Sequence, residues 1–383
     1  MDRTPQKILI VAGEESGDMR AAPLVRAIHT YAPDIRFIGI GGERLRQAGV
    51  ATFADINELA VIGFTEVLIH YPRIKRIFDM TVKKLQEERP DAVLLVDYPG
   101  FNLRLAEKAK KLGIKVIYYV SPQVWAWKES RVKLIKRVVD RMIVLFPFEK
   151  EFYAKHGYEV DFVGHPLVDE NRADKGASDF LKSIGLNDKA PTLALLPGSR
   201  NKEVSRHLPP MLEAAILLKK DHPKLQIILL QAKNLNKEIF DKPLKKAPHG
   251  LIVSRDYYNA LNAADLCVVA SGTATLETGI LGKPMAVIYK TSWLTFLIAR
   301  LVIRIPYISL VNIVAGKKIV EELLQQHANP KKIAKVIDDF LRNPEKARAT
   351  RKELAGLKTK LGSPGASQRA AKIILTELGK SSH

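Results

Sequence analysis

The sequence contains a single cysteine, so no disulfide can form within the chain. Cys267 lies in the apolar run Leu266–Val269 and has the character of a small core residue, a usage that fits a reducing compartment. Hydrophobic residues make up 46% of the 383 residues, which excludes a disordered chain and a small disulfide scaffold. The length predicts two domains rather than one.

Long uncharged apolar runs are also missing. No stretch reaches the 18 or more apolar residues of a transmembrane helix, and the nearest approach, Trp293–Ile305, is interrupted by Arg300 and Arg304. The first residues, Met1–Gln6, hold no apolar segment of signal-peptide length. We therefore expect a cytoplasmic protein without a membrane span.

Acidic residues are scarce relative to basic ones: 41 Asp and Glu stand against 61 Lys and Arg, a net charge of +20. Such an excess favours a polyanionic partner, namely nucleic acid, an anionic membrane or a phosphorylated substrate. The apolar segment from Trp293 carries Arg300 and Arg304 one helical turn apart. It suits a helix lying in a membrane surface with arginines at the headgroups, or a helix packed between domains.

Several binding motifs are lacking as well. The chain has no G-x-G-x-x-G, no Walker loop, no Asp-x-Asp and no His/Cys cluster at metal-ligand spacing. We therefore expect neither a cofactor nor a metal ion. A diphosphate would have to be neutralised by arginine and by helix N-termini.

Short, almost continuously apolar runs alternate with longer helical patterns, which is typical of parallel strands buried on both faces. The pattern pauses near Gly164–Pro166 and then starts again. The sequence predicts two Rossmann-like, doubly wound α/β domains, residues 1–168 and 169–345, facing across a ligand-binding cleft. A charged helical tail, residues 346–383, is expected to pack back on the first domain. The predicted strands are Lys7–Ala12, Ile35–Ile40, Ala92–Asp97, Lys115–Val120, Arg141–Phe146, Asp161–Gly164, Pro191–Leu196, Leu225–Leu230, Leu251–Ser254, Leu266–Ala270 and Pro284–Tyr289.

Candidate residues of the first domain follow its strands. Asp97 ends a buried run, where rigid placement and partial burial suit a general base, although an Asp that caps the next turn fits equally. Glu14, Ser16 and Asp18 follow the first strand, either in a binding loop or in a tight turn before a helix. Trp125 and Trp127 could stack on a sugar, enter lipid or pack between domains.

Two strand ends of the second domain suit a nucleotide. Gly198, Ser199 and Arg200 combine a permissive glycine, a hydroxyl and a guanidinium before a helix, a combination suited to a diphosphate; a surface arginine in an ordinary turn is the alternative. Thr273 and Glu277 share one helix face. The carboxylate could bind both hydroxyls of a ribose, or simply favour the helix dipole.

Taken together, these motifs resemble those of the lipid-A-disaccharide synthases, glycosyltransferases of bacterial lipid A assembly, along the whole chain. The similar segments are VAGEESGD (11–18), VDYPGFN (96–102), YYVSPQVWAW (118–127), LFPFEKEFY (145–153), VGHP (163–166), LLPGSR (195–200), SGTATLE (271–277), YISLVNIVAG (307–316) and VEELLQ (320–325).

The resemblance implies the metal-independent GT-B glycosyltransferase fold. It also implies transfer of 2,3-diacylglucosamine from its UDP conjugate to the 6-hydroxyl of 2,3-diacylglucosamine 1-phosphate, with inversion, to a β-1,6-linked disaccharide 1-phosphate and UDP. An enzyme with these substrates would work at the inner membrane surface, and a homodimer is compatible with the family. No nucleic-acid partner is implied.

The resemblance also assigns roles to individual residues. Asp97 matches the family's essential aspartate, which we expect to be the general base, and Arg200 matches the arginine that meets the UDP diphosphate. The remaining matches are Gly198, Ser199, Thr273, Glu277, Asn312 and Gln325 on the donor (UDP) side, and Glu14, Ser16 and Asp18 on the acceptor side.

Two other functions are compatible with parts of the sequence. A UDP-N-acetylglucosamine 2-epimerase would share the two-domain architecture and the nucleotide, but it would leave the apolar segment at Trp293 without a purpose. A nucleic-acid-binding protein is suggested by charge alone, because the chain has no aromatic and basic module of the RNA-binding kind.

Overall fold

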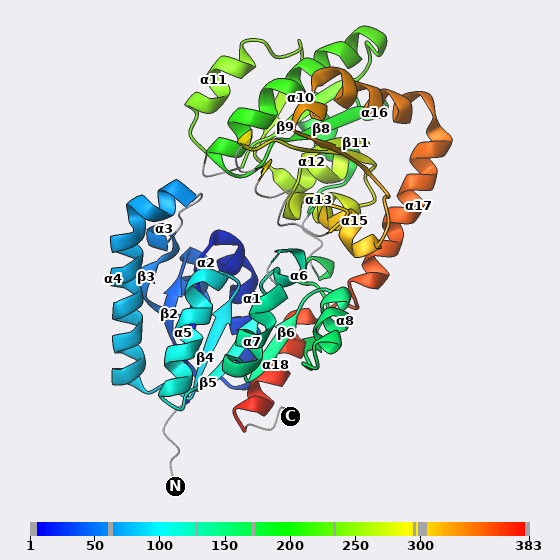
Figure 1. Cartoon of the computed structure of the whole chain (residues 1–383). Coiled ribbons are helices and arrows are strands. Elements are labelled where there is room, and N and C mark those ends of the chain that lie inside the picture. Colours follow the sequence, from blue (N-terminus) through cyan, green and yellow to red (C-terminus); the bar gives the residue numbers. More distant parts are fainter. Residues whose placement is uncertain are drawn as a thin grey trace. The chain divides into compact units, whose positions relative to one another are not determined.

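The computed structural model describes residues 6–59, 64–127, 129–169, 173–232, 235–293, 296–297 and 305–379. The chain forms two compact units (Figure 1). The first unit contains Met1–Asp169 and Gly362–His383, and the second contains Glu170–Leu361. None of the helices in the described ranges is long and apolar enough to cross a membrane.

The first unit is built on a seven-stranded sheet in the order β3-β2-β1-β4-β5-β6-β7, and every neighbouring pair is parallel. Four of its central strands carry only apolar residues after the first position, because both faces of the sheet are covered by helices. The strands are β1 Lys7–Ala12, β2 Arg36–Gly41, β3 Ala51–Asp55, β4 Ala92–Val96, β5 Lys115–Tyr119, β6 Arg141–Val144 and β7 Asp161–Phe162.

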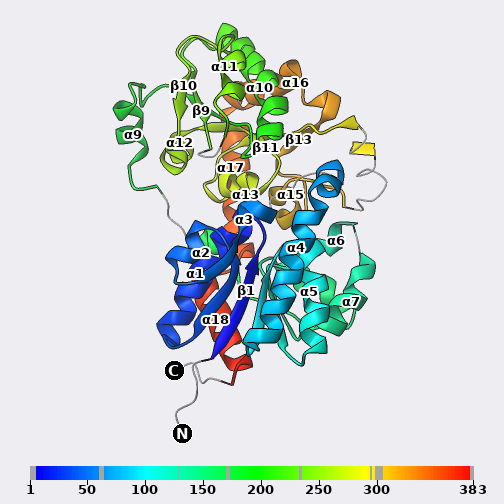
Figure 2. The same cartoon turned by 90° about the vertical axis from the view of Figure 1, so that its left-hand side faces the viewer.

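Alternate strand residues point to opposite faces of this sheet. Leu9 and Val11 join one core cluster with residues of α4, α5 and α7, whereas α1 packs with α2 and α18 (Figure 2). The helices are α1 Glu15–Tyr31, α2 Glu43–Gln47, α3 Ile56–Leu59, α4 Phe64–Glu88, α5 Pro99–Lys111, α6 Val124–Trp127, α7 Val132–Val138, α8 Pro147–Lys155 and α18 Ala366–Glu377.

The second unit repeats this plan with six parallel strands in the order β10-β9-β8-β11-β12-β13. Its strands are β8 Thr192–Leu196, β9 Gln226–Leu230, β10 Ile252–Ser254, β11 Leu266–Ala270, β12 Met285–Tyr289 and β13 Glu321–Leu324. Its helices are α9 Ala177–Ser183, α10 Asn201–Asp221, α11 Glu238–Leu244, α12 Tyr257–Ala263, α13 Thr273–Ile280, α15 Leu310–Ala315, α16 Pro330–Arg342 and α17 Pro344–Lys360. Helices α10, α11 and α16 share one core cluster with the sheet.

The predicted fold class of two Rossmann-like units with a helical tail is confirmed, with local corrections. Strands β3 and β13 are absent from the prediction. The tail does not begin at residue 346, because α17 packs on α13 and α15 in the second unit. Only the residues from Gly362 onward belong with the first unit, where α18 packs on α1.

Each sheet has one point at which the strand order reverses. In the first unit the reversal lies between β1 and β4, and in the second between β8 and β11. Doubly wound sheets bind ligands at the carboxyl ends of the strands that flank such a point. We therefore expect a binding site in the loops that follow these four strands.

Candidate functional site

Asp97 follows β4 directly, at the reversal point of the first sheet. Its φ of 49° and the φ of 48° at Tyr98 put two consecutive non-glycine residues in the left-handed region. Such strain persists only where the surroundings fix the backbone. Here the Asp97 N–H donates to the Tyr119 carbonyl (3.2 Å), and the Asp97 carbonyl accepts from the Tyr118 hydroxyl (2.5 Å) and the Asn102 amide (2.8 Å).

Asn102 stabilises the turn at Asp97 and Tyr98 through its side-chain amide. Its side chain is fully buried on α5, and its Nδ2 also donates to the Val96 carbonyl at 3.2 Å. The amide therefore joins the last residue of β4 to the strained turn. The result is a rigid backbone that carries the Asp97 carboxylate at the edge of the sheet.

The Asp97 carboxylate is partly buried, with a side-chain exposure of 32%, and its Oδ2 lies 4.0 Å from Nη1 of Arg20 on α1. Burial raises the pKa of this carboxyl, while Arg20 and the Tyr98 backbone N–H act in the opposite direction. A raised pKa makes a carboxylate a stronger proton acceptor, which suits a general base.

The loop after β1 lies against the same turn. A Cβ on Gly13 would stand 2.3 Å from a ring carbon of Tyr98, so only glycine lets this ring cover the loop. The Tyr98 hydroxyl donates to the Leu59 carbonyl, and burial together with the nearby Glu14 carboxylate raises its pKa to about 12. Ser16 lies partly exposed in the first turn of α1. Glu14 and Ser16 thus share the reversal point with Asp97.

Asp18 has a different environment from the acceptor-side position expected for it. Its side chain is only 2% exposed. Its carboxylate accepts the backbone N–H groups of Gly42 (2.7 Å), Arg44 (3.1 Å) and Leu45 (3.2 Å) at the start of α2. These contacts support a structural role, because one carboxylate satisfies three otherwise orphaned N–H donors.

An aromatic group follows β5 and β6 in the first unit. Trp125 packs edge-on against Phe148, and its indole N–H donates to the buried carboxylate of Glu149 at 3.3 Å. Glu149 also accepts the N–H groups of Leu145 and Phe146. Burial raises the Glu149 pKa to about 7, and these hydrogen bonds limit the rise. The structure thus holds the ring of Trp125 in place.

The loop after β8 carries the expected diphosphate residues at the reversal point of the second sheet. Gly198 has a φ of 122°, and a Cβ there would lie 2.8 Å from Oε2 of Glu203. Ser199 and Arg200 are exposed immediately before α10 begins. Arg200 donates to Glu203 at 3.2 Å. The N–H groups of the first helical turn and the guanidinium lie at one edge, where an anion would be favoured.

Thr273 and Glu277 belong to α13, which begins just after β11 on the other side of the same reversal point. Glu277 is partly exposed and accepts hydrogen bonds from Tyr257 (2.8 Å to Oε2) and Tyr258 (3.3 Å to Oε1). Both tyrosines begin α12. These two hydrogen bonds therefore fix the orientation of the Glu277 carboxylate at the edge formed by the carboxyl ends of the strands.

Buried polar side chains fix the neighbouring loops of this edge. His207 pairs one ring nitrogen with the Pro197 carbonyl (3.0 Å) and the other with the Lys290 N–H (2.9 Å), and burial lowers its pKa. Gln325, buried and with a φ of 48°, makes two hydrogen bonds to the backbone of Thr291. Gln325 thus holds the loop that follows β12.

Asn312 is fully buried on α15. Its Oδ1 accepts the N–H groups of Ile319 and Val320, and its Nδ2 donates to the Val320 carbonyl and to Glu322. Each of these bonds stays within the protein, which supports a clamp between α15 and β13. Direct contact with the donor remains a prediction for Asn312 and for Gln325.

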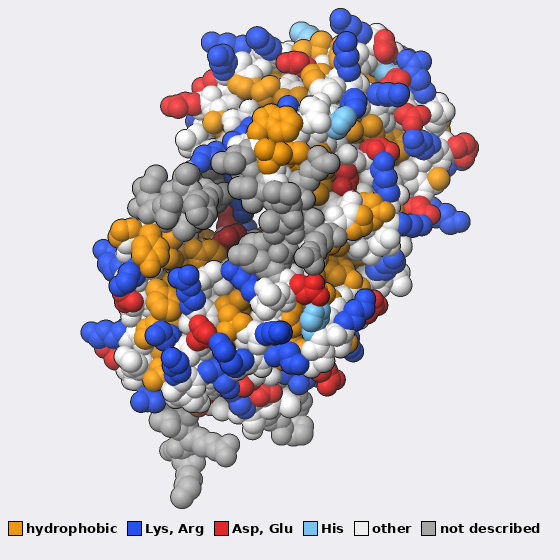
Figure 3. All heavy atoms as spheres, in the orientation of Figure 1, with side chains coloured by type: hydrophobic (Ala, Val, Ile, Leu, Met, Phe, Trp, Pro, Cys, Tyr) orange, Lys and Arg blue, Asp and Glu red, His pale blue; other side chains and the backbone are white. Residues whose placement is uncertain are grey.

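The predicted membrane segment is described only in part. Trp293 and Leu297 expose 62% and 52% of their surface, and the Trp293 ring packs edge-on against Phe296. Arg300 and Arg304 lie outside the described residues. Lys and Arg side chains are spread over the face drawn in Figure 3.

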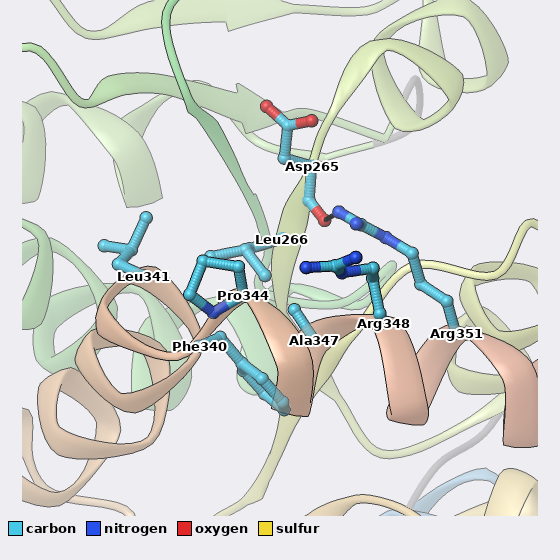
Figure 4. Close-up of a pocket in the computed structure, with 8 residues that line it drawn as sticks. All are labelled: Asp265, Leu266, Phe340, Leu341, Pro344, Ala347, Arg348 and Arg351. Carbon is cyan, nitrogen blue, oxygen red and sulfur yellow. Dashed lines mark hydrogen bonds between the residues drawn. The ribbon is translucent and has the colours of Figure 1, made fainter.

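A cavity of about 280 Å³ lies elsewhere in the second unit (Figure 4). Asp265 and Leu266, at the amino end of β11, form part of its wall, so it is at the sheet edge opposite to the candidate site. Arg348 and Arg351 reach into it from α17. Within the described ranges, no group of three His, Cys, Asp or Glu side chains could hold a metal ion.

Sequence reasoning missed the residues that act on the candidate side chains. Arg20 lies one helical turn after Ser16, so a helix beginning at Glu15 would have placed both on one face. Tyr257 and Tyr258 gave no such signal, because their contact with Glu277 arises only when α12 and α13 meet in the folded unit.

Known proteins show a consistent likeness to this chain. A model of the lipid-A-disaccharide synthetase family matches residues 8–376. The chain belongs to this family. The lipid-A-disaccharide synthase of Syntrophus aciditrophicus (strain SB) is 48% identical over 376 residues, which cover 98% of both chains. That of Geobacter sulfurreducens is 43% identical over 380 residues, 99% of both.

Solved structures show the same fold at low sequence identity. A putative UDP-N-acetylglucosamine 2-epimerase from Listeria monocytogenes has a TM-score of 0.66 and 15% identity, over 97% of this chain and 96% of its own. The calicheamicin glycosyltransferase CalG4 has a TM-score of 0.63 and 15% identity, over 98% and 99%. Membership of the lipid-A-disaccharide synthetase family makes the chain a glycosyltransferase of lipid A biosynthesis, with a GT-B-like fold.

Proposed function

We propose that the protein transfers 2,3-diacylglucosamine from UDP to the 6-hydroxyl of 2,3-diacylglucosamine 1-phosphate, with inversion. The observation that carries this proposal is the half-buried Asp97 carboxylate, held on a strained turn at the reversal point of the first sheet. Inversion by direct displacement needs a base that takes the proton of the acceptor hydroxyl, and groups that stabilise the charge on the departing UDP. Each unit supplies one of these two parts.

Asp97 is the general base in this proposal. Its carboxylate takes the proton of the acceptor 6-hydroxyl while that oxygen bonds to the anomeric carbon of the donor. The bond from the anomeric carbon to the β-phosphate oxygen breaks, and its electron pair leaves with UDP. Since attack and departure occur on opposite faces, the anomeric configuration inverts.

The second unit binds the leaving group. Arg200 and the N–H groups at the start of α10 stabilise the charge that develops on the diphosphate, and the small Gly198 and Ser199 allow close approach. Glu277 accepts the ribose hydroxyls, with Thr273 beside it at the start of α13. His207 and Gln325 keep the flanking loops in place. Glu14 and Ser16 stand on the acceptor side.

Both lipid substrates carry acyl chains, so the enzyme must work at an anionic membrane surface, here the inner membrane. The net charge of +20 favours such a surface. We assign the contact to the exposed Trp293 and Leu297. Replacing both with serine should reduce sedimentation with anionic liposomes, whereas serine at the exposed Val253 of the same unit should not. If the Trp293 and Leu297 variant sediments with the liposomes as much as the Val253 variant does, these two residues do not make the membrane contact.

The reaction itself is tested by UDP release from UDP-2,3-diacylglucosamine, with and without 2,3-diacylglucosamine 1-phosphate. Release should require the acceptor, and NMR of the product should show a β-1,6 linkage. Release or isomerisation of the donor without acceptor, as an epimerase would give, contradicts the proposal.

A further inference from the structure

Both carboxylate oxygens of Glu277 accept a hydrogen bond from a tyrosine hydroxyl. Tyr257 donates to Oε2 at 2.8 Å, and Tyr258 donates to Oε1 at 3.3 Å. These tyrosines come from a helix other than the one that carries Glu277. We infer that Tyr257 and Tyr258 are positioning residues that set the orientation of Glu277 and thereby make the site selective for a ribonucleotide. This inference rests on the proposed role of Glu277 at the ribose.

The two tyrosines are themselves held firmly. Their rings pack edge to face, with centroids 5.1 Å apart. Asn259, buried in the same first turn of α12, donates to Asp256 (2.9 Å) and to Asp174 (2.6 Å) and accepts the Asp174 and Lys175 N–H groups. Because this turn is tied to the chain before α9, the hydroxyls present a fixed pair of donors.

The location of α12 places this pair beside the nucleotide site. Helix α12 packs against β8 and β9, and β8 leads into the loop of Arg200. Helix α13, with Glu277, follows β11, the strand that neighbours β8. The tyrosines therefore act at the edge where the diphosphate is proposed to bind.

The two tyrosine hydroxyls donate to different oxygens of the Glu277 carboxylate. What they remove is rotation: an exposed Glu side chain samples several rotamers, and holding one costs entropy unless partners fix it. With both oxygens fixed, the carboxylate meets a 2′- and a 3′-hydroxyl in one geometry. A deoxyribose then leaves a polar acceptor poorly matched, and that mismatch is the source of selectivity.

The test measures the affinities of UDP and 2′-deoxy-UDP by calorimetry for the whole protein and for Tyr257→Phe, Tyr258→Phe and the double variant. The wild type should prefer UDP. We expect each single variant to lose UDP affinity by roughly 3- to 10-fold. The loss for 2′-deoxy-UDP should be smaller, so the preference ratio shrinks and is smallest in the double variant. The KM for the donor should rise with little change in kcat, because the tyrosines do not act on the transferred proton.

Tyr158→Phe is the matched control, since it removes a partly buried hydroxyl that donates to the Val139 carbonyl in the first unit. It should leave the preference ratio unchanged. If the tyrosine variants weaken both nucleotides equally, or bind UDP more tightly, the inference is overturned. The proposed role of Glu277 at the ribose has its own test. If Glu277→Gln leaves the UDP affinity unchanged, that role is wrong as well as the inference on the tyrosines.

Discussion

Arg20 Nη1 lies 4.0 Å from Oδ2 of Asp97, and the Arg20 side chain is only 12% exposed. This cation comes from α1, the helix that follows the first strand, and it faces the carboxylate that follows β4. Helix α1 and the turn after β4 are thus linked electrostatically at the reversal point of the first sheet. Burial and Arg20 act in opposite directions on the pKa of Asp97, which is raised overall.

The Arg20 contact predicts a change in pH dependence. Asp97 is active as a base only when ionised, so turnover falls as the pH drops through its pKa. Removing the cation in Arg20→Leu raises this pKa further, so the acid limb of the pH–rate profile should move to higher pH. Arg20→Lys should restore the limb in part. The matched control is Arg26→Leu, an exposed arginine on the same helix, and an identical shift in that variant would argue against a local effect.

Arg200 should be required for nucleotide binding rather than for folding. Its guanidinium is 47% exposed and pairs with Glu203 in the first turn of α10. Arg200→Ala should weaken UDP binding by roughly 10- to 100-fold in calorimetry, because a charge-assisted contact to the diphosphate is lost. Arg348→Ala removes the same charge at the opposite edge of the sheet and should bind UDP normally. Undiminished affinity in Arg200→Ala would rule out the diphosphate loop.

Asp18 should be needed for stability. Asp18→Ala leaves three backbone N–H groups at the start of α2 without their acceptor. We expect a loss of roughly 2–4 kcal/mol in the free energy of unfolding, measured with denaturant. Glu43→Ala, an exposed carboxylate in the same helix, is the control. A stable Asp18→Ala protein with impaired acceptor binding would instead support the acceptor-side role.

Glu149 should make stability depend on pH. Its pKa of about 7 in the folded protein exceeds the ordinary value of 4.5, so the folded state holds this proton more tightly than the unfolded state. The corresponding stabilisation is present below about pH 4.5 and is lost as the pH rises to about 7.

Glu149→Gln should abolish this part of the pH dependence of unfolding. Glu151→Gln changes an exposed residue of the same helix and should retain it. A wild-type stability that stays constant between pH 4.5 and 7.5 would contradict the assignment.

Much of the fold could be predicted from the sequence because the central strands are apolar after their first residue. Strand β13 was not predicted because two of its four residues, Glu321 and Glu322, are charged. Glu322 is tolerated there because its carboxylate accepts from Ser309 and Asn312. Such compensation depends on distant residues and cannot be read from the strand alone.

Asp97, Arg200 and Glu277 could be proposed from the sequence because each follows a recognisable strand, and doubly wound sheets bind ligands at the carboxyl ends of their strands. Their roles at the site stay predictions. The environments of these residues could not be predicted from the sequence. Asp18 and Asn312 have the residue types of ligand contacts, and only the folded structure shows their polar atoms bound to neighbouring backbone.

The role of Asp97 is tested most directly by Asp97→Asn, with turnover and UDP affinity measured on the same preparation. The account predicts a turnover lower by roughly 10²–10⁴ with UDP affinity unchanged, while Asp79→Asn, an exposed aspartate on α4, remains fully active. An Asp97→Asn enzyme that turns over at the wild-type rate would show that another group removes the acceptor proton.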